Sequence, residues 1–294
     1  MNSLIRSVFK VSVVGAAAAL IGAGCAPVRD NAAPGVAGDT QMAVLTSDGS
    51  GFFDVQIMDM NGNALHLVDA NLAEPVGLSY HPDDFFIVST GYSTLLRVDM
   101  DGTTTPFNDA PIGTVYRTFV SGDDGTTTVS GEYDATRLDE DGNEIDSLSV
   151  GSQYCWMDSG AGLDVGNPAM LDVFGPTIAI WDTSTDTFSN VATNIGYSAN
   201  ILGYDDGGNY YVGSSYDQNL WTVNDQGETA SLGTLTAMGI DAYGVKALEP
   251  ASTNSVMALV DSNLGSTIVE IDNGGNLREI TTAGGAVWLD MVTF

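Results

Sequence analysis

Apolar and polar residues alternate along most of the chain after residue 41, in short runs that end at Asp or Asn. A period of two is the pattern of a β-strand with one buried face. Six segments share one order: an alternating run, an Asp or Asn, a turn, and a second short alternating run. Each segment predicts a β-hairpin. The anchoring residues are Asp59, Asp99, Asp139, Asp182, Asn224 and Asp272.

The turns of these hairpins have a chemical reason to form. An Asp or Asn side chain closes the entering strand by accepting backbone hydrogen bonds, and a glycine supplies the positive φ that the turn requires. The fourth hairpin has a Thr/Ser/Asp loop, Thr183 to Thr187, where the others have glycine. The glycines of the other five turns are Gly62, Gly102, Gly142, Gly227 and Gly275.

The anchors recur at intervals of 40, 40, 43, 42 and 48 residues. Two further strand-like runs lie between successive hairpins, for example Pro75 to Tyr80 and Phe85 to Ser89, which makes four strands per repeat. Units of this size and strand number are typical of a β-propeller. We therefore predict an all-β fold over residues 41–294, a six-bladed β-propeller of four-stranded antiparallel blades.

The two ends of this region predict how the ring closes. Only one strand, Met42 to Thr46, precedes the first hairpin, and one spare strand lies within Ala286 to Phe294 after the last. We expect Val287 to Val292 to form the innermost strand of the first blade, whose other strands come from the N-terminal end. Closure of this kind removes open sheet edges.

The N-terminal residues 1–24 have the pattern of a secretory signal peptide. Arg6 and Lys10 precede an apolar run from Val11 to Gly24, which is too short to span a bilayer. The end of the run, Leu20 to Cys25, resembles a bacterial lipobox, with Gly22 where a branched aliphatic residue is usual. A plain secretory signal with an incidental cysteine is the alternative.

The lipobox resemblance implies lipidation of Cys25, with residues 25–40 as a flexible tether. Ala26 follows the cysteine in place of the aspartate associated with inner-membrane retention, which implies the outer membrane, facing the periplasm or the exterior. The membrane would then be contacted only through the lipid anchor.

Charge narrows the range of partners. Asp and Glu number 38 against 8 Lys and Arg, for a formal net charge of −30. Nucleic acid is excluded as a partner, because phosphate binding needs clustered basic residues. A solvated acidic surface favours a soluble monomer. The alternative interpretation is that some carboxylates hold a divalent cation such as Ca²⁺.

The segment from Pro75 to Val88 resembles the NHL repeat, in which a Pro-x-Gly-Leu strand leads through a His/Asp-Pro-Asp-Gly turn into a second strand. Asn200 to Val212 is a second, similar copy. The related propellers with chemistry are the gluconolactonase and regucalcin-like proteins, in which Glu, Asn and Asp from inner strands hold one divalent cation. That resemblance implies Glu74 and Asn200 as ligands.

The third ligand departs from the pattern of those propellers. Where they carry the Asp, this chain reads Ala242-Tyr243-Gly244, so Asp241 or Asp290 would have to replace it. The candidate metal set is therefore Glu74, Asn200 and Asp241. The alternative is that Glu74 and Asn200 are polar residues at strand starts. The two histidines, His66 and His81, have no neighbourhood that suggests a base for a nucleophile.

Aromatic residues gather in the regions that lead into innermost strands or join second to third strands. Rigid rings with polar tips beside Asp and Asn suit a sugar, a peptide or another neutral-to-cationic ligand. Packing between blades is the alternative role for large rings. The candidate ligand-binding residues are Tyr154, Trp156, Asn200, Tyr216, Tyr243 and Trp288.

The sequence thus predicts a non-enzymatic ligand- or protein-binding or scaffolding lipoprotein of the bacterial cell envelope, with no catalytic residue or cofactor assigned. Its expected partner is an envelope protein, a peptide or a carbohydrate. The alternative is a divalent-metal-dependent hydrolase of the lactonase type.

Overall fold

The computed structural model describes residues 40–91, 94–108, 115–121, 125–131, 134–149, 155–156, 168–172, 175, 177–196, 199–263 and 265–294. The predicted signal peptide and Cys25 lie outside these residues, so lipidation stays a prediction. Strands make up almost all of the described structure. None of the described helices is long and apolar enough to cross a membrane.

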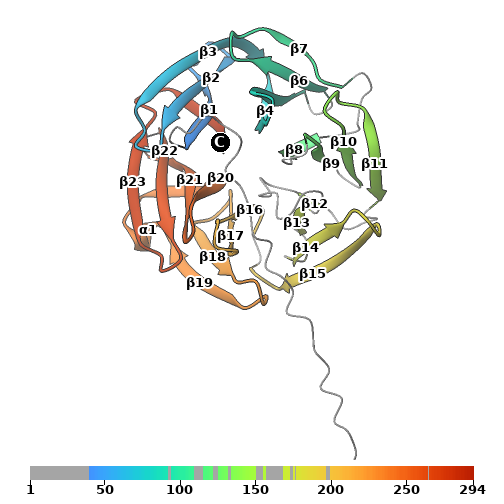
Figure 1. Cartoon of the computed structure of the whole chain (residues 1–294). Helices are drawn as coiled ribbons and strands as arrows, with labels where there is room; N and C mark the ends of the chain where they lie inside the picture. Colours follow the sequence, from blue (N-terminus) through green and yellow to red (C-terminus); the bar gives the residue numbers. More distant parts are fainter. Residues whose placement is uncertain are drawn as a thin grey trace, which may run out of the picture.

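Six four-stranded sheets form a ring, with the sixth blade followed by the first (Figure 1). Blade 1 contains β24 (Val287–Thr293), β1 (Gln41–Ser47), β2 (Phe52–Asp59) and β3 (Ala64–Ala73). Blade 2 contains β4 (Pro75–His81), β5 (Phe85–Thr90), β6 (Thr94–Asp99) and β7 (Thr104–Pro106). Blade 3 contains β8 (Val115–Ser121), β9 (Thr127–Gly131), β10 (Asp134–Leu138) and β11 (Glu144–Ser149).

The remaining blades follow the same order from the inner to the outer strand. Blade 4 contains β12 (Cys155–Trp156), β13 (Ala169–Asp172), β14 (Thr177–Asp182) and β15 (Thr187–Thr193). Blade 5 contains β16 (Ile201–Tyr204), β17 (Tyr210–Gly213), β18 (Asn219–Val223) and β19 (Thr229–Thr234). Blade 6 contains β20 (Ala242–Ser252), β21 (Ser255–Ser262), β22 (Gly265–Asp272) and β23 (Leu277–Thr282). The predicted six-bladed fold is confirmed.

Each predicted hairpin anchor lies between the third and fourth strands of its blade, as expected. At Asp59 the side-chain Oδ1 accepts a hydrogen bond from the Asn63 amide at 2.8 Å, and Gly62, with φ of 80°, donates its amide to the Asp59 carbonyl at 2.9 Å. Asn63 also donates from Nδ2 to Asp59 Oδ2 at 2.7 Å. The turn is therefore held by both the backbone and the paired side chains.

The longest anchor interval, from Asn224 to Asp272, has a structural cause that the sequence pattern did not reveal. A short helix, α1 (Leu235–Met238), lies between β19 and β20. Thr234 caps its start by accepting the Ala237 amide at 3.2 Å, and Gly239 ends it with a φ of 110°. Strand β20, of 11 residues, adds further length to the repeat.

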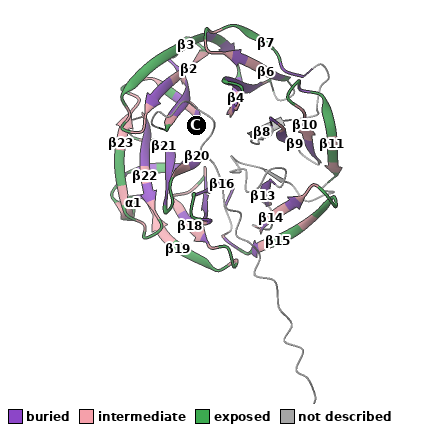
Figure 2. Ribbon diagram, viewed as in Figure 1, coloured by how far each residue is buried: buried purple, intermediate pink, exposed green. Residues whose placement is uncertain are grey.

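The hydrophobic core lies between neighbouring blades, and each described cluster joins two of them. Residues of blades 1 and 2 share one cluster that includes Leu45 and Phe86, and blades 4 and 5 share another that includes Leu171 and Tyr204. The residues of outer strands such as β11, β19 and β23 are exposed or half-buried, while those of the inner strand β16 are buried (Figure 2). The sheets therefore pack face to face around the ring.

The C-terminal strand closes the ring as predicted. Strand β24 pairs antiparallel with β1, in a register that joins Met42 to Thr293 and Ala43 to Val292. Gln41 and Phe294 exchange backbone hydrogen bonds of 2.8 and 2.9 Å. The first blade is therefore built from both ends of the described chain, and the C-terminus lies inside the ring (Figure 1).

Candidate functional site

Two faces of the ring follow from the strand order. We call entry face the side that carries the loops leading into inner strands and the loops joining second to third strands. We call hairpin face the opposite side, which carries the Asp-anchored turns. Because every blade is antiparallel and runs from its inner to its outer strand, each of these connections recurs on the same side.

Two exposed tyrosines stand on the entry face of blades 5 and 6. Tyr216 lies in the loop between β17 and β18 and is 79% exposed, and Tyr243, at the start of β20, is 61% exposed. A Cβ added to Gly244 would lie 2.7 Å from the Ser215 carbonyl oxygen. The residues next to the two tyrosines are therefore in direct backbone contact, so Tyr216 and Tyr243 extend from neighbouring backbone positions of the entry face.

A chain of side-chain hydrogen bonds fixes Tyr243 beside a carboxylate. The Tyr243 hydroxyl donates to Asn263 Oδ1, and Asn263 Nδ2 donates to Asp241 Oδ2. The Asn263 amide also donates to the Asp241 carbonyl at 3.3 Å. We call Tyr216, Tyr243, Asn263 and Asp241 the tyrosine surface. Sequence reasoning missed Asn263, whose place in a loop joining second to third strands was its one signal.

The buried side chain of Asn200 holds the loop next to Tyr216 in place. It is 8% exposed, and its side chain holds Ser215 by two hydrogen bonds: Nδ2 donates to Ser215 Oγ at 2.6 Å, and Oδ1 accepts the Ser215 amide at 2.8 Å. This pair fixes the loop that presents Tyr216. In the structure Asn200 thus orients the loop through its amide group.

Trp288 packs between two blades, which is the alternative to ligand binding that the sequence left open for large rings. It is 6% exposed and belongs to the cluster of apolar side chains between blades 6 and 1, together with Met58 and Leu259. Its ring is therefore part of the core beneath the entry face. Tyr154 lies outside the described residues. The structure gives only the backbone of Trp156, in β12.

The candidate metal residues lie at the starts of three different inner strands. Glu74 is an exposed residue with φ of 48° just before β4, Asn200 precedes β16, and Asp241 precedes β20. Among the described residues, no group of three or more His, Cys, Asp or Glu side chains could hold a metal ion. The metal site stays a prediction, which the metal content of the purified chain would test.

Asp290, the other carboxylate considered as a ligand, is bound to the backbone of a neighbouring blade. It is 6% exposed, and its Oδ2 accepts the amide of Leu78 in β4 at 2.8 Å. Burial of a carboxylate requires such partners. The side chain therefore links β24 of blade 1 to the inner strand of blade 2.

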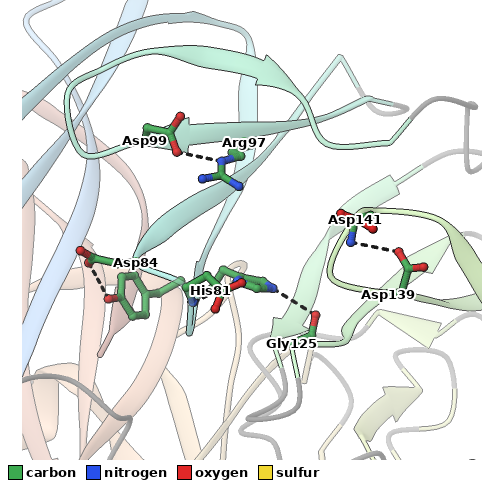
Figure 3. A network of polar contacts seen from close by, with 9 residues as sticks. His81, Asp84, Arg97, Asp99, Gly125, Asp139 and Asp141 are labelled. Carbon is green, nitrogen blue, oxygen red and sulfur yellow. Dashed lines mark hydrogen bonds and ion pairs between the residues drawn. The ribbon is translucent and has the colours of Figure 1, made fainter.

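Both histidines lie on the hairpin face and link neighbouring blades. The His81 ring is 1% exposed and stacks on Phe85 with centroids 4.2 Å apart; its Nδ1 accepts the Asp83 amide at 3.2 Å. Nε2 therefore carries the hydrogen and donates to the Gly125 carbonyl of blade 3 at 3.0 Å (Figure 3). His66 Nε2 donates likewise to the Met100 carbonyl at 3.3 Å. Neither ring faces the tyrosine surface.

Solved structures with this fold share little sequence with the chain. A chain of a nidogen/laminin complex superposes with a TM-score of 0.64 at 11% identity, over 87% of this chain and 98% of that chain. Virginiamycin B lyase from Staphylococcus aureus gives 0.57 at 10%, over 82% and 84%. TolB from Acinetobacter baumannii gives 0.57 at 13%, over 87% and 69%.

These similarities show the fold alone. A lyase, TolB and a chain of the nidogen/laminin complex superpose on this chain with similar TM-scores and at low sequence identity. No protein-family model matches the chain, and no curated protein matches it by sequence. An argument about function therefore has to come from the site.

Proposed function

We propose that the protein is a non-enzymatic binding or scaffolding lipoprotein of the cell envelope, and that the tyrosine surface is its binding region. The observation that carries the proposal is the pair of exposed rings on adjacent blades, Tyr216 and Tyr243, each held by a buried or hydrogen-bonded support. Exposed apolar side chains that gather on one part of a surface mark interaction sites, and tyrosine is enriched where proteins bind one another.

The preorganisation of the surface supports the same proposal. Asn200 fixes the loop that carries Tyr216, and Asn263 fixes the Tyr243 hydroxyl. Side chains that are already ordered lose less conformational entropy when a ligand binds. The loop that carries Tyr216 and the side chain of Tyr243 are therefore ordered before a ligand binds.

Both histidines support a non-enzymatic role for the described residues. Each is bound to a backbone carbonyl of the next blade, on the face opposite the tyrosine surface. A general base has to reach the proton that it abstracts. Neither imidazole can do so for a ligand on the tyrosine surface.

Site-specific photocrosslinking in the source cell tests the proposal. We would introduce p-benzoylphenylalanine by Tyr216→Bpa and, as a control on the outer strand β19 of the same blade, by Ala230→Bpa. We expect one dominant crosslinked species from position 216 and none of that size from position 230. The added change Tyr243→Ala should lower its yield. Equal crosslinking from both positions, or none from 216, would overturn the proposal.

A further inference from the structure

The tyrosine surface combines two aromatic rings with the carboxylate of Asp241. The donor that binds this carboxylate, the Asn263 side chain, is neutral and leaves its negative charge in place. Asp241 is exposed, and Asn263 supplies it with a neutral amide donor. The amide holds the carboxylate and the Tyr243 ring in a fixed relation, because it is bonded to both. A carboxylate and a phenol ring that are held by the same amide together attract a cation, the first by its charge and the second by the electron-rich face of the ring.

The lysine nearest to this surface is turned into the molecule. Lys246 lies three residues after Tyr243, but its side chain is only 15% exposed and its Nζ is 2.6 Å from Asp261 Oδ1. Nζ also donates to the Trp288 carbonyl of blade 1 at 2.9 Å. The ammonium group is therefore engaged by blade 6 and by the closing strand, and does not occupy the tyrosine surface.

The charge of the whole chain acts in the same direction. With 38 acidic against 8 basic residues, the protein attracts cationic partners and repels anionic ones over distances longer than direct contact. The wider field cannot select a site by itself. The rings and the fixed carboxylate of the tyrosine surface supply the local selectivity.

We propose that the tyrosine surface binds a lysine or arginine side chain presented by a partner peptide or protein segment. The rings of Tyr216 and Tyr243 would cover the apolar stem and the charged head of that side chain, and Asp241 would supply the counter-charge. This inference rests on the proposed function, since it assumes that the surface is the binding region, and it specifies the chemistry of the ligand.

Titration of the mature chain with tetralysine amide tests the inference, with the Nε-acetylated tetralysine as a neutral match. The readout is the ring signals of Tyr216 and Tyr243 in two-dimensional NMR, assigned with Tyr216→Leu and Tyr243→Leu. We expect saturable shifts of both rings with tetralysine, weakening at high salt because the attraction is screened. We expect no shifts with the acetylated peptide.

Matched variants separate the local site from general attraction to an acidic protein. Asp241→Asn keeps an oxygen that can accept the Asn263 amide but removes the charge, and should weaken tetralysine binding about fivefold, the size of an exposed cation–π or ion-pair contribution. Asp225→Asn removes one exposed charge from a turn on the hairpin face and should leave binding unchanged. Thermal unfolding of each variant confirms that it is folded.

The possible outcomes distinguish the inference from the proposed function. Equal weakening by Asp241→Asn and Asp225→Asn, or unchanged tetralysine binding in Tyr216→Leu and Tyr243→Leu, would show general attraction and overturn the inference. Ring shifts with acetylated tetralysine, or with chitotetraose but not tetralysine, would also overturn it while leaving a binding surface. If no probe shifts the NMR signals of either ring, and position 216 gives no crosslink, both proposals are overturned.

Discussion

Asp205 and Asp272 begin turns of the same pattern, in which the carboxylate accepts two backbone amides and an Asn side chain. Asp205 Oδ1 accepts Gly207 and Asn209 amides at 2.9 Å, and Asp272 Oδ1 accepts Gly274 and Asn276 amides at the same distance. Burial nevertheless raises the pKa of Asp205, whereas the Asn276 side chain lowers the pKa of Asp272. Desolvation of Asp205 therefore outweighs its donors, which include the Tyr211 side chain in addition to the set that Asp272 has.

This pair predicts opposite pH dependences for two isosteric changes. A lowered pKa contributes stability above the unfolded value of about 4, which is lost as the pH falls through the folded pKa. Asp272→Asn should therefore cost more free energy of unfolding at pH 7 than at pH 3. The raised pKa of Asp205 works the other way, so Asp205→Asn should become more favourable, relative to the parent, as the pH rises from 3 to 7.

Denaturant unfolding of the parent and both variants at pH 3, 5 and 7 measures these differences. In each variant the new Asn side chain faces the Asn at the end of the same turn, Asn209 or Asn276. The change from a carboxylate to an amide therefore perturbs the two turns in the same way. Differences of the same sign for the two variants would contradict the assignment of burial as the dominant cause at Asp205.

At the scale of the element, the hairpin turns also join neighbouring blades. The turn glycine of one blade lies against the outer part of the blade before it: a Cβ at Gly102 would overlap the Asp69 carbonyl, one at Gly142 the Phe107 carbonyl, and one at Gly227 the Val191 carbonyl. Each glycine thus serves twice, for its positive φ and for the close approach of two backbones. The hairpin turn of each of these blades therefore also packs against the preceding blade of the ring.

Gly142→Ala should accordingly destabilise the protein more than a change that only strains φ. At Gly142 (φ +80°) an added Cβ meets the neighbouring backbone, whereas at Gly49 (φ +93°) it meets nothing within 4 Å. We expect a loss of about 1 kcal/mol for Gly49→Ala and about 2–5 kcal/mol for Gly142→Ala. Equal losses in chemical denaturation would show that blade contact adds nothing to the φ requirement.

The sequence predicted these turns because their chemistry is local, an Asp or Asn followed within a few residues by glycine. It could not show the second role of the glycines, since the carbonyl that each one meets lies in another blade. The fourth hairpin shows what local chemistry can replace: Asp182 accepts the Ser184 amide at 2.9 Å, and Asp186, with φ of 52°, takes the left-handed conformation without glycine.

The site was less predictable than the turns, because exposure depends on which blade a residue meets. Alternation predicts Trp288 and Asp290 on one side of β24. The register of β24 against β1 shifts between Val44 and Thr46, however, and Trp288 packs with residues of blade 6 while Asp290 binds blade 2. Tyr243 stands at a strand start in the same way and is exposed. A strand pattern therefore predicts the face of a side chain only where the strand has no bulge, and it does not identify the neighbour of that face.

At the scale of the whole molecule, β24 connects three blades. It pairs with β1 in blade 1, its Trp288 carbonyl accepts hydrogen bonds from Lys246 and Ser266 of blade 6, and its Asp290 binds Leu78 of blade 2. Phe294, which follows the strand, stacks on Tyr80 of blade 2 at 4.2 Å between ring centroids. The closing strand therefore holds blade 1 to blade 6 on one side and to blade 2 on the other.

Removal of residues 286–294 should abolish cooperative unfolding of the entire ring. The deletion exposes the inner edge of β1, opens the cluster between blades 6 and 1, and leaves the Leu78 amide without its carboxylate partner. We expect a broad, non-cooperative thermal transition in the truncated chain. A synthetic peptide of residues 286–294 should restore a sharp transition, and the same peptide with Trp288→Ala should restore it less. An unchanged melting temperature after truncation would mean that closure is not what holds the blades together, and that the contacts between consecutive blades are sufficient without it.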